Sequence, residues 1–130
     1  MILNNYPKTA QLLQDYYTTM MLASIDRANI PDDFKETIRK DGISLDKIEI
    51  IVNSNPRHLF EFFDDRSMYI DIKANFDGTF QYALLDGNVS NLGSLDKFKT
   101  RKQADAAAIE AAISTLENKL NLLDNDNKDS

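Results

Sequence analysis

The chain has 130 residues, of which 42% are hydrophobic and 9% aromatic, enough for one modest core and too many for a disordered chain. Acidic residues number 21 and basic residues 15, so the net charge of -6 disfavours long-range attraction to phosphate backbones and favours basic surfaces. Because cysteine is absent, the composition excludes disulfides, thiolate zinc sites, iron–sulfur clusters and cysteine nucleophiles.

No segment of the sequence has the features of an export signal or a membrane span. The opening "MILNNYPKTA" lacks both a basic n-region and a sustained apolar run. No later segment approaches the roughly 18 consecutive apolar residues that a transmembrane helix needs. We therefore expect a soluble, cytoplasmic protein.

The amino-terminal half of the chain is predicted to be mainly helical. Over residues 8–28, apolar side chains recur at helical spacing and cover nearly half of the cylinder: Leu12, Leu13, Tyr16, Tyr17, Met20, Met21 and Ile25. A second, shorter helix is expected to open at Pro31 and to close at Gly42 in the left-handed conformation. Residues 47–53 are rich in β-branched side chains and predict a strand or a buried connector, and residues 54–65 predict a short helix.

A β-hairpin is the clearest local prediction. Apolar and polar residues alternate over 68–75 and again over 79–85. Asp77-Gly78 lies between these two segments and predicts a two-residue turn with positive φ angles. The segment 88–98 can supply a further antiparallel strand.

The last predicted element is a long helix over residues 101–123. Thr100 is its expected cap, and an apolar ridge runs along one face: Ile109, Ile113, Leu116, Leu120 and Leu123. Residues 124–130 have nothing to bury and are expected to form a mobile acidic tail. The order of elements predicts an α+β fold with an antiparallel sheet of three to four strands, packed by helices in a single domain over residues 1–123.

A cationic quartet precedes the last helix: Lys97, Lys99, Arg101 and Lys102. The stretch "TRKQADAAAIEAAI" resembles the second helix of double-stranded RNA-binding domains, and the first helix resembles the opening helix of that family. The resemblance implies that the quartet and the helix amino end meet phosphates. Asp105, however, stands at the third basic position of the motif, and "FDGTF" replaces the Gly-Pro-X-His loop of that family.

The same residues are also compatible with a terminal helix that only packs against the rest of the domain, which is the interpretation we favour. Alanine is the best helix former, and its small side chain lets a helix lie close to a sheet. Asp105, Glu110 and Glu117 follow the quartet and are expected to pair with it at the surface. Nucleic acid is therefore an alternative partner and not the leading one.

A second resemblance covers about half of the chain, residues 58–120. The segments "LFEFFDDRSMYIDI" and "FKTRKQADAAAIEAAISTLENKL" are similar to small uncharacterised proteins of phages and prophages of gut anaerobes. Those proteins combine an LFDFFDE-like segment with a terminal F-x-[ST]-R-x-E-A helix, in which Gln103 replaces the Glu here. The resemblance implies a phage-linked accessory protein in a bacterial cytoplasm, with no activity attached.

The sequence predicts no catalytic, cofactor-binding or metal-binding residues. His58 is the sole histidine and has no neighbouring nucleophile motif, while Asp64 and Asp65 are adjacent and diverge by about 100° on a helix. The four glycines lie in turn contexts and do not form a phosphate-binding loop. We therefore do not expect an enzyme.

The remaining candidate is a protein-binding surface on the first helix. Tyr16, Tyr17, Met20 and Met21 offer the large, adaptable side chains that partner contacts use, although a plain core explains them as well. The leading hypothesis is a non-enzymatic protein that binds another protein, for example a host defence factor. Self-association into a homodimer through this helix is a further hypothesis.

Overall fold

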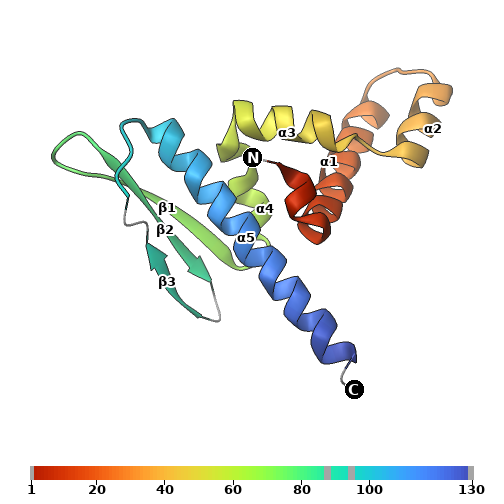
Figure 1. Ribbon diagram of the computed structural model, residues 1–130. Coiled ribbons are helices and arrows are strands. Elements are labelled where there is room, and N and C mark those ends of the chain that lie inside the picture. Colours follow the sequence, from red (N-terminus) through yellow and green to blue (C-terminus); the bar gives the residue numbers. More distant parts are fainter. Residues whose placement is uncertain (1, 87–88, 94–95, 129–130) are drawn as a thin grey trace. The chain divides into compact units, whose positions relative to one another are not determined.

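The computed structural model describes residues 2–86, 89–93 and 96–128, and Figure 1 shows the order of their helices and strands. The chain separates into two compact units, Met1–Ile51 and Val52–Ser130. Compact units of this kind occur both inside one domain and as two domains, so the single domain over residues 1–123 stays a prediction.

The unit Met1–Ile51 is helical, as the sequence predicts. Its elements are a 3-10 turn η1 (Leu3–Asn5), helix α1 (Pro7–Arg27), helix α2 (Asp32–Asp41) and the first part of helix α3 (Leu45–Ser54). Pro7 begins α1 where its missing N–H costs nothing. Gly42 ends α2 with φ 69° and ψ -173°, so φ is positive as predicted but ψ is extended and not left-handed helical.

Helix α3 corrects the prediction of a strand or connector over residues 47–53. Ile48 and Val52 are fully buried and lie four residues apart, a helical spacing, while Ile50 between them is exposed. The Lys47 N–H donates to Ser44 Oγ (3.4 Å), which satisfies one free donor at the amino end of the helix. Ile and Val favour strands, but this preference depends on context. Here burial of two of these residues on one face of a helix outweighs it.

The unit Val52–Ser130 has α+β architecture, which confirms the predicted fold class. A short helical segment, η2 (Pro56–Leu59) and α4 (Phe60–Asp64), leads into strands β1 (Met68–Ala74), β2 (Phe80–Asp86) and β3 (Val89–Gly93) and helix α5 (Arg101–Lys128). The strands pair antiparallel in the order β1-β2-β3. The predicted number of strands stays a prediction, since residues 87–88 and 94–95 lie outside the described residues.

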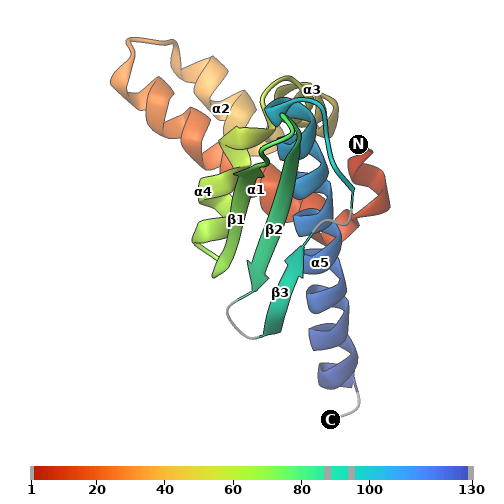
Figure 2. The same ribbon diagram turned by 90° about the vertical axis from the view of Figure 1, so that its left-hand side faces the viewer.

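Helices α4 and α5 lie against the same face of this sheet (Figure 2). The inward-facing residues of the hairpin include Met68 and Leu84, which are fully buried. The ridge on α5 is buried as predicted over Ile109, Ile113 and Leu116, and the alanines of the same face are buried with it: Ala104, Ala108 and Ala112. Small residues on this face allow the helix to approach the sheet closely.

The turn of the hairpin differs from the predicted two-residue turn. The Asn75 N–H donates to the Thr79 carbonyl (2.8 Å) and the Gly78 N–H donates to the Asn75 carbonyl (3.1 Å), which leaves a three-residue loop. Gly78 has φ 83°, and Asp77 has no positive φ. This is the turn in which a left-handed Gly follows a type I turn, a common alternative to the two-residue loop.

Helix α5 runs five residues further than the predicted end at 123. It continues through 124–128, which the sequence analysis assigned to a mobile tail, because Asp, Asn and Lys weaken a helix but do not interrupt its hydrogen bonds as Pro does. Leu123, predicted on the inner face, is exposed. Thr100 caps α5 as predicted: Gln103 N–H donates to Thr100 Oγ1 (3.1 Å), and Thr100 N–H donates to Gln103 Oε1 (3.3 Å).

Candidate functional site

The predicted partner-binding residues of α1 divide into core and surface. Tyr17 is buried and Tyr16 is half-buried, and their rings meet edge to face at 5.5 Å. Met20 and Met21 are 50% and 39% exposed. The structure therefore keeps the two methionines as candidate contact residues and assigns Tyr17 to the interior.

Met21 lies at the edge of a groove in the unit Met1–Ile51. The groove has a volume of about 330 Å³, and its apolar lining comes from Met21, Phe34, Ile38 and Ile43. Phe34 is 52% exposed, although it is a large aromatic side chain. The sequence analysis missed Phe34, because only the pairing of α2 with α1 shows that these two side chains share one surface. We call this surface the α1–α2 groove.

Hydrogen bonds between α1 and the segment after α2 fix the floor of the α1–α2 groove. Gln14 Nε2 donates to the Ile43 carbonyl (2.9 Å), and the Ile43 N–H donates to Thr18 Oγ1 (3.1 Å). A Cβ atom on Gly42 would lie 3.2 Å from Thr18 Oγ1, and the positive φ of Gly42 already disfavours other residues. Polar contacts thus hold the groove, in which Ile38 and Ile43 are buried while Met21 and Phe34 are exposed.

The cationic quartet does not converge on one point. Lys97 Nζ pairs with Asp77 (3.3 Å), and the Arg101 guanidinium lies over the Phe80 ring at 5.2 Å. Lys99 and Lys102 are exposed, and neither makes an ion pair with a described residue. Figures 1 and 2 show the amino end of α5 and the hairpin turn at the same end of the unit Val52–Ser130.

The expected pairing of the quartet with acidic residues of α5 is wrong for Asp105. Arg57, from η2, binds Asp105 through two hydrogen bonds of 3.2 and 3.1 Å. Asp105 and Glu117 are both buried and not on the surface, since they lie on the same face of α5 as the apolar ridge. A pocket of about 360 Å³ beside this pair is lined by Arg57, Arg101 and Lys102.

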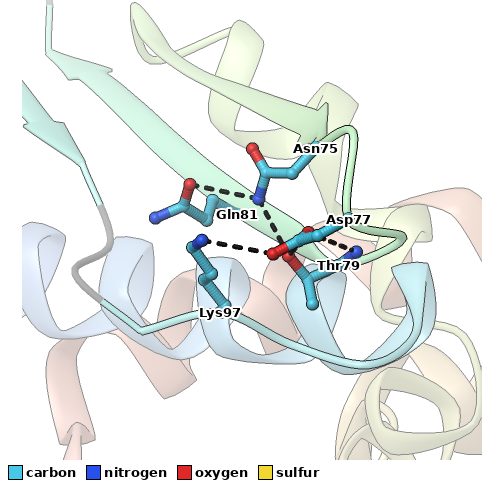
Figure 3. A network of polar contacts seen from close by, with 5 residues as sticks. All are labelled: Asn75, Asp77, Thr79, Gln81 and Lys97. Carbon is cyan, nitrogen blue, oxygen red and sulfur yellow. Dashed lines mark hydrogen bonds and ion pairs between the residues drawn. The ribbon is translucent and has the colours of Figure 1, made fainter.

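The hairpin turn carries a polar network that the sequence analysis did not predict (Figure 3). The Thr79 N–H and hydroxyl both donate to Asp77 Oδ1, and Asn75 Nδ2 donates to Thr79 Oγ1 (3.1 Å) and to Gln81 Oε1 (3.2 Å). The available signal was the run "NFDGT", in which Asn and Asp can bond to nearby backbone. Phe76, the apolar side chain of this turn, is fully exposed to solvent.

The network holds Asp77 in its ionised form. Hydrogen bonds from the Thr79 side chain and main chain, followed by the smaller contribution of Lys97, lower the pKa of Asp77 from 3.8 to about 2. Asp77 therefore carries its charge at any ordinary pH, and the turn keeps the same contacts.

The residues considered for acid–base chemistry, His58, Asp64 and Asp65, are all exposed. His58 Nε2 lies 3.0 Å from Asn55 Nδ2, and both residues are exposed. Asp64 and Asp65 are exposed at the end of α4. Across the described ranges, no three His, Asp or Glu side chains are placed to hold a metal ion. Nor does any helix in the described part of the chain have the length and apolar character needed to cross a membrane.

Comparison with known proteins gives no family. No protein-family model, curated protein or solved structure matches the chain. The resemblances to phage proteins and to double-stranded RNA-binding domains therefore stay predictions.

Tyr17→Phe should stabilise the protein by about 1 kcal/mol, because the buried Tyr17 hydroxyl has no hydrogen-bond partner among the described residues and an unpaired buried hydroxyl is costly. Burial, and then the charge of Tyr16, raise the pKa of Tyr17 from 10.0 to about 12, so stability should fall above pH 10, where the unfolded hydroxyl ionises first. Urea denaturation at neutral pH and near pH 11 measures both effects. Tyr69→Phe, at an exposed tyrosine, is the control, and a Tyr17→Phe variant less stable than wild type would contradict the assignment.

Thr79→Val should raise the pKa of Asp77 towards 3.8, and by more than Lys97→Met does, because it removes the Thr79 hydroxyl hydrogen bond, the largest cause of the shift, while the Thr79 main-chain bond stays. The depressed pKa means that this contribution to stability is present above pH 3.8 and is lost as the pH falls towards 2. NMR titration of the Asp77 carboxyl carbon in wild type, Thr79→Val and Lys97→Met measures the three pKa values and so their order. A larger shift in Lys97→Met would show that the ion pair, and not the turn, holds Asp77.

Proposed function

We propose that this chain is a non-enzymatic protein that acts by binding another protein through the α1–α2 groove. The observation that carries the proposal is the pair of half-exposed side chains, Met21 and Phe34, at an apolar groove whose floor is fixed by hydrogen bonds. Methionine and aromatic side chains are enriched in interface cores, because they offer a large contact area and methionine adapts its shape.

The groove suits an amphipathic helix with one or two apolar side chains to insert. Its volume of about 330 Å³ is at the small end of binding cavities. Full burial of a Met or Phe side chain stabilises by about 1.5–3 kcal/mol, and about half of that remains available in each of these half-exposed residues. Asp41 and Lys47 also line the groove, so one basic and one acidic residue beside the apolar ridge of the partner would complement them.

The resemblance to phage proteins over residues 58–120 supports the part of this proposal that concerns where the protein acts and on which kind of partner. A small accessory protein in a bacterial cytoplasm would act on a host protein, for example a defence factor, by occupying one of its surfaces. Neither the resemblance nor the groove requires a cofactor or a metal ion.

Met21→Asp and Phe34→Asp should each weaken partner binding by at least tenfold, since a carboxylate in the groove must lose its water when a partner docks. Partners are captured from a bacterial host lysate, and each affinity is then measured with the purified partner by calorimetry. Met20→Asp is the matched control, because Met20 is also exposed on α1, somewhat more than Met21, but does not line the groove. Tyr17 is unsuitable for such a test because it is buried.

Equal loss in Met20→Asp, or full binding by Met21→Asp, would contradict the groove as the binding surface. Thermal denaturation of all three variants checks that each one folds. A chain that captures nothing from the lysate would count against the proposed function itself.

A second function, nucleic-acid binding, is favoured by one observation. Arg57, Arg101 and Lys102 line one pocket at the amino end of α5, a helix end that attracts phosphates, and exceed in charge the single carboxylate of that lining, Asp105, which Arg57 binds. Lys97 and Lys99 lie on the segment just before it, and the hairpin turn, to which the exposed Phe76 belongs, lies at the same end of the unit (Figure 1). Aromatic rings beside cations are the usual components of sites for nucleic acids.

If this second function is correct, Lys99→Ala with Lys102→Ala should weaken binding to duplex RNA or DNA and reduce the slope of log K against log salt by about 2. Gel shifts at several low salt concentrations measure the slope. Arg27→Ala with Lys40→Ala removes the same charge from the unit Met1–Ile51 and should leave the slope unchanged. Absence of salt-dependent binding by the wild type would exclude this function.

A further inference from the structure

Strand β1 is an edge strand of the sheet. In the unit Val52–Ser130 the strand order β1-β2-β3 leaves one side of β1 without a strand partner. β1 has seven residues, contains no proline and pairs with β2 without a bulge. Of the features by which natural proteins protect edge strands, β1 lacks shortness, proline and bulges, and it carries two charged residues, Asp71 and Lys73. Such an edge can accept another strand.

The hairpin turn fixes which main-chain groups point out from this edge. The bond from Asn75 N–H to the Thr79 carbonyl makes these two residues a hydrogen-bonded pair. Hydrogen-bonded and non-hydrogen-bonded pairs alternate in an antiparallel ladder, and the β1–β2 register runs on from this turn without a shift. Main-chain groups of the even-numbered residues therefore point away from β2: Met68, Ile70, Ile72 and Ala74. Among the described residues, none of these groups has a partner.

The charged residues of β1 make the edge complementary to itself. Asp71 and Lys73 alternate with these residues, lie on the face of the sheet opposite to α5, and form no ion pair with any described residue. If two copies pair antiparallel about a two-fold axis at Ile72, Asp71 of each copy lies directly opposite Lys73 of the other. In an antiparallel ladder these are the closely spaced, non-hydrogen-bonded pairs, in which opposite charges attract most strongly.

The neighbouring registers are worse. An axis at Asp71 would place the two Asp71 carboxylates opposite each other, and an axis at Ile70 would place Asp71 opposite Tyr69. The register about Ile72 also sets Ile70 opposite Ala74 and Ile72 opposite Ile72 on the inner face, where both isoleucines are only half-buried in the single chain. Charge, hydrogen bonding and apolar burial thus select the same register.

We propose that two copies of this chain associate through β1, pairing antiparallel about Ile72, so that their sheets join into one continuous sheet. The strand that binds this edge is a second copy and not an unrelated strand, because antiparallel pairing of two copies places Asp71 of each opposite Lys73 of the other. The register also places the hairpin turn, with the exposed Phe76, beside the Met68 end of β1 in the other copy. A pairing limited to one strand buries a small area, so the dimer forms reversibly and depends on concentration.

Charge reversal tests the register. Asp71→Lys and Lys73→Asp each replace two attractive cross-strand pairs with two repulsive ones, and each should raise the dimer dissociation constant by about tenfold. The double variant, Asp71→Lys with Lys73→Asp, restores both pairs in reverse and should return to within about threefold of wild type. Sedimentation velocity over a wide range of protein concentration measures all four constants, and added salt should narrow the differences.

A backbone variant tests the edge itself. Ala74→Pro removes an outward N–H but no β1–β2 bond, so it should abolish dimerisation and leave the folded monomer intact by circular dichroism. Met21 is not part of the proposed contact, so Met21→Asp should dimerise like wild type. The same variant should lose partner binding at the α1–α2 groove, and the two proposals can therefore fail independently. A wild type that stays monomeric at every concentration overturns the proposal. So does a dimer that tolerates Ala74→Pro, or one that the double variant fails to restore.

Discussion

The docking of α5 on the hairpin sheet is the interaction on which the unit Val52–Ser130 depends. The buried face of α5 carries three alanines that allow close approach and larger residues such as Ile109 and Ile113 that fill the interface. Burying each of these larger side chains stabilises by about 1.5–3 kcal/mol, whereas partly exposed ion pairs contribute at most about 1 kcal/mol. Apolar burial therefore holds the helix in place. The ion pairs Arg57–Asp105 and Lys119–Asp86 fix its position along the sheet.

The hairpin and the terminal helix could be predicted, because the apolar periodicity of each extends over more residues than the uncertainty in its ends. Together these elements gave the α+β class. The α3 helix could not, since four β-branched residues in a short run are compatible with either structure until the tertiary contacts show that Ile48 and Val52 are the buried ones. The end of α5 was missed for a related reason. Polar residues give no burial signal, and no Pro or Gly stands there to stop the helix.

The candidate sites were harder to predict than the fold. The apolar stripe on α1 covers nearly half of the helix, so its pattern does not say which part faces inwards; the structure buries Tyr17 and exposes Met20. Phe34 joins Met21 only because α2 turns back on α1. Likewise, Arg57 and Asp105 are 48 positions apart, and no local pattern connects them. Sites made from distant segments depend on the tertiary fold.

In the unit Val52–Ser130, some contacts join residues close in the sequence and others join distant residues. This difference determines which elements of the unit can form first. The turn bonds of Asn75 and Thr79 close a loop of a few residues, an event of microseconds, while docking of α5 must close a loop that contains the whole sheet. On the ribosome, where the chain grows from its amino end, the hairpin can therefore form before α5 has been made. Until that helix emerges, only α4 lies against the inner face of the sheet, and the apolar side chains that α5 covers are open to solvent or to a chaperone.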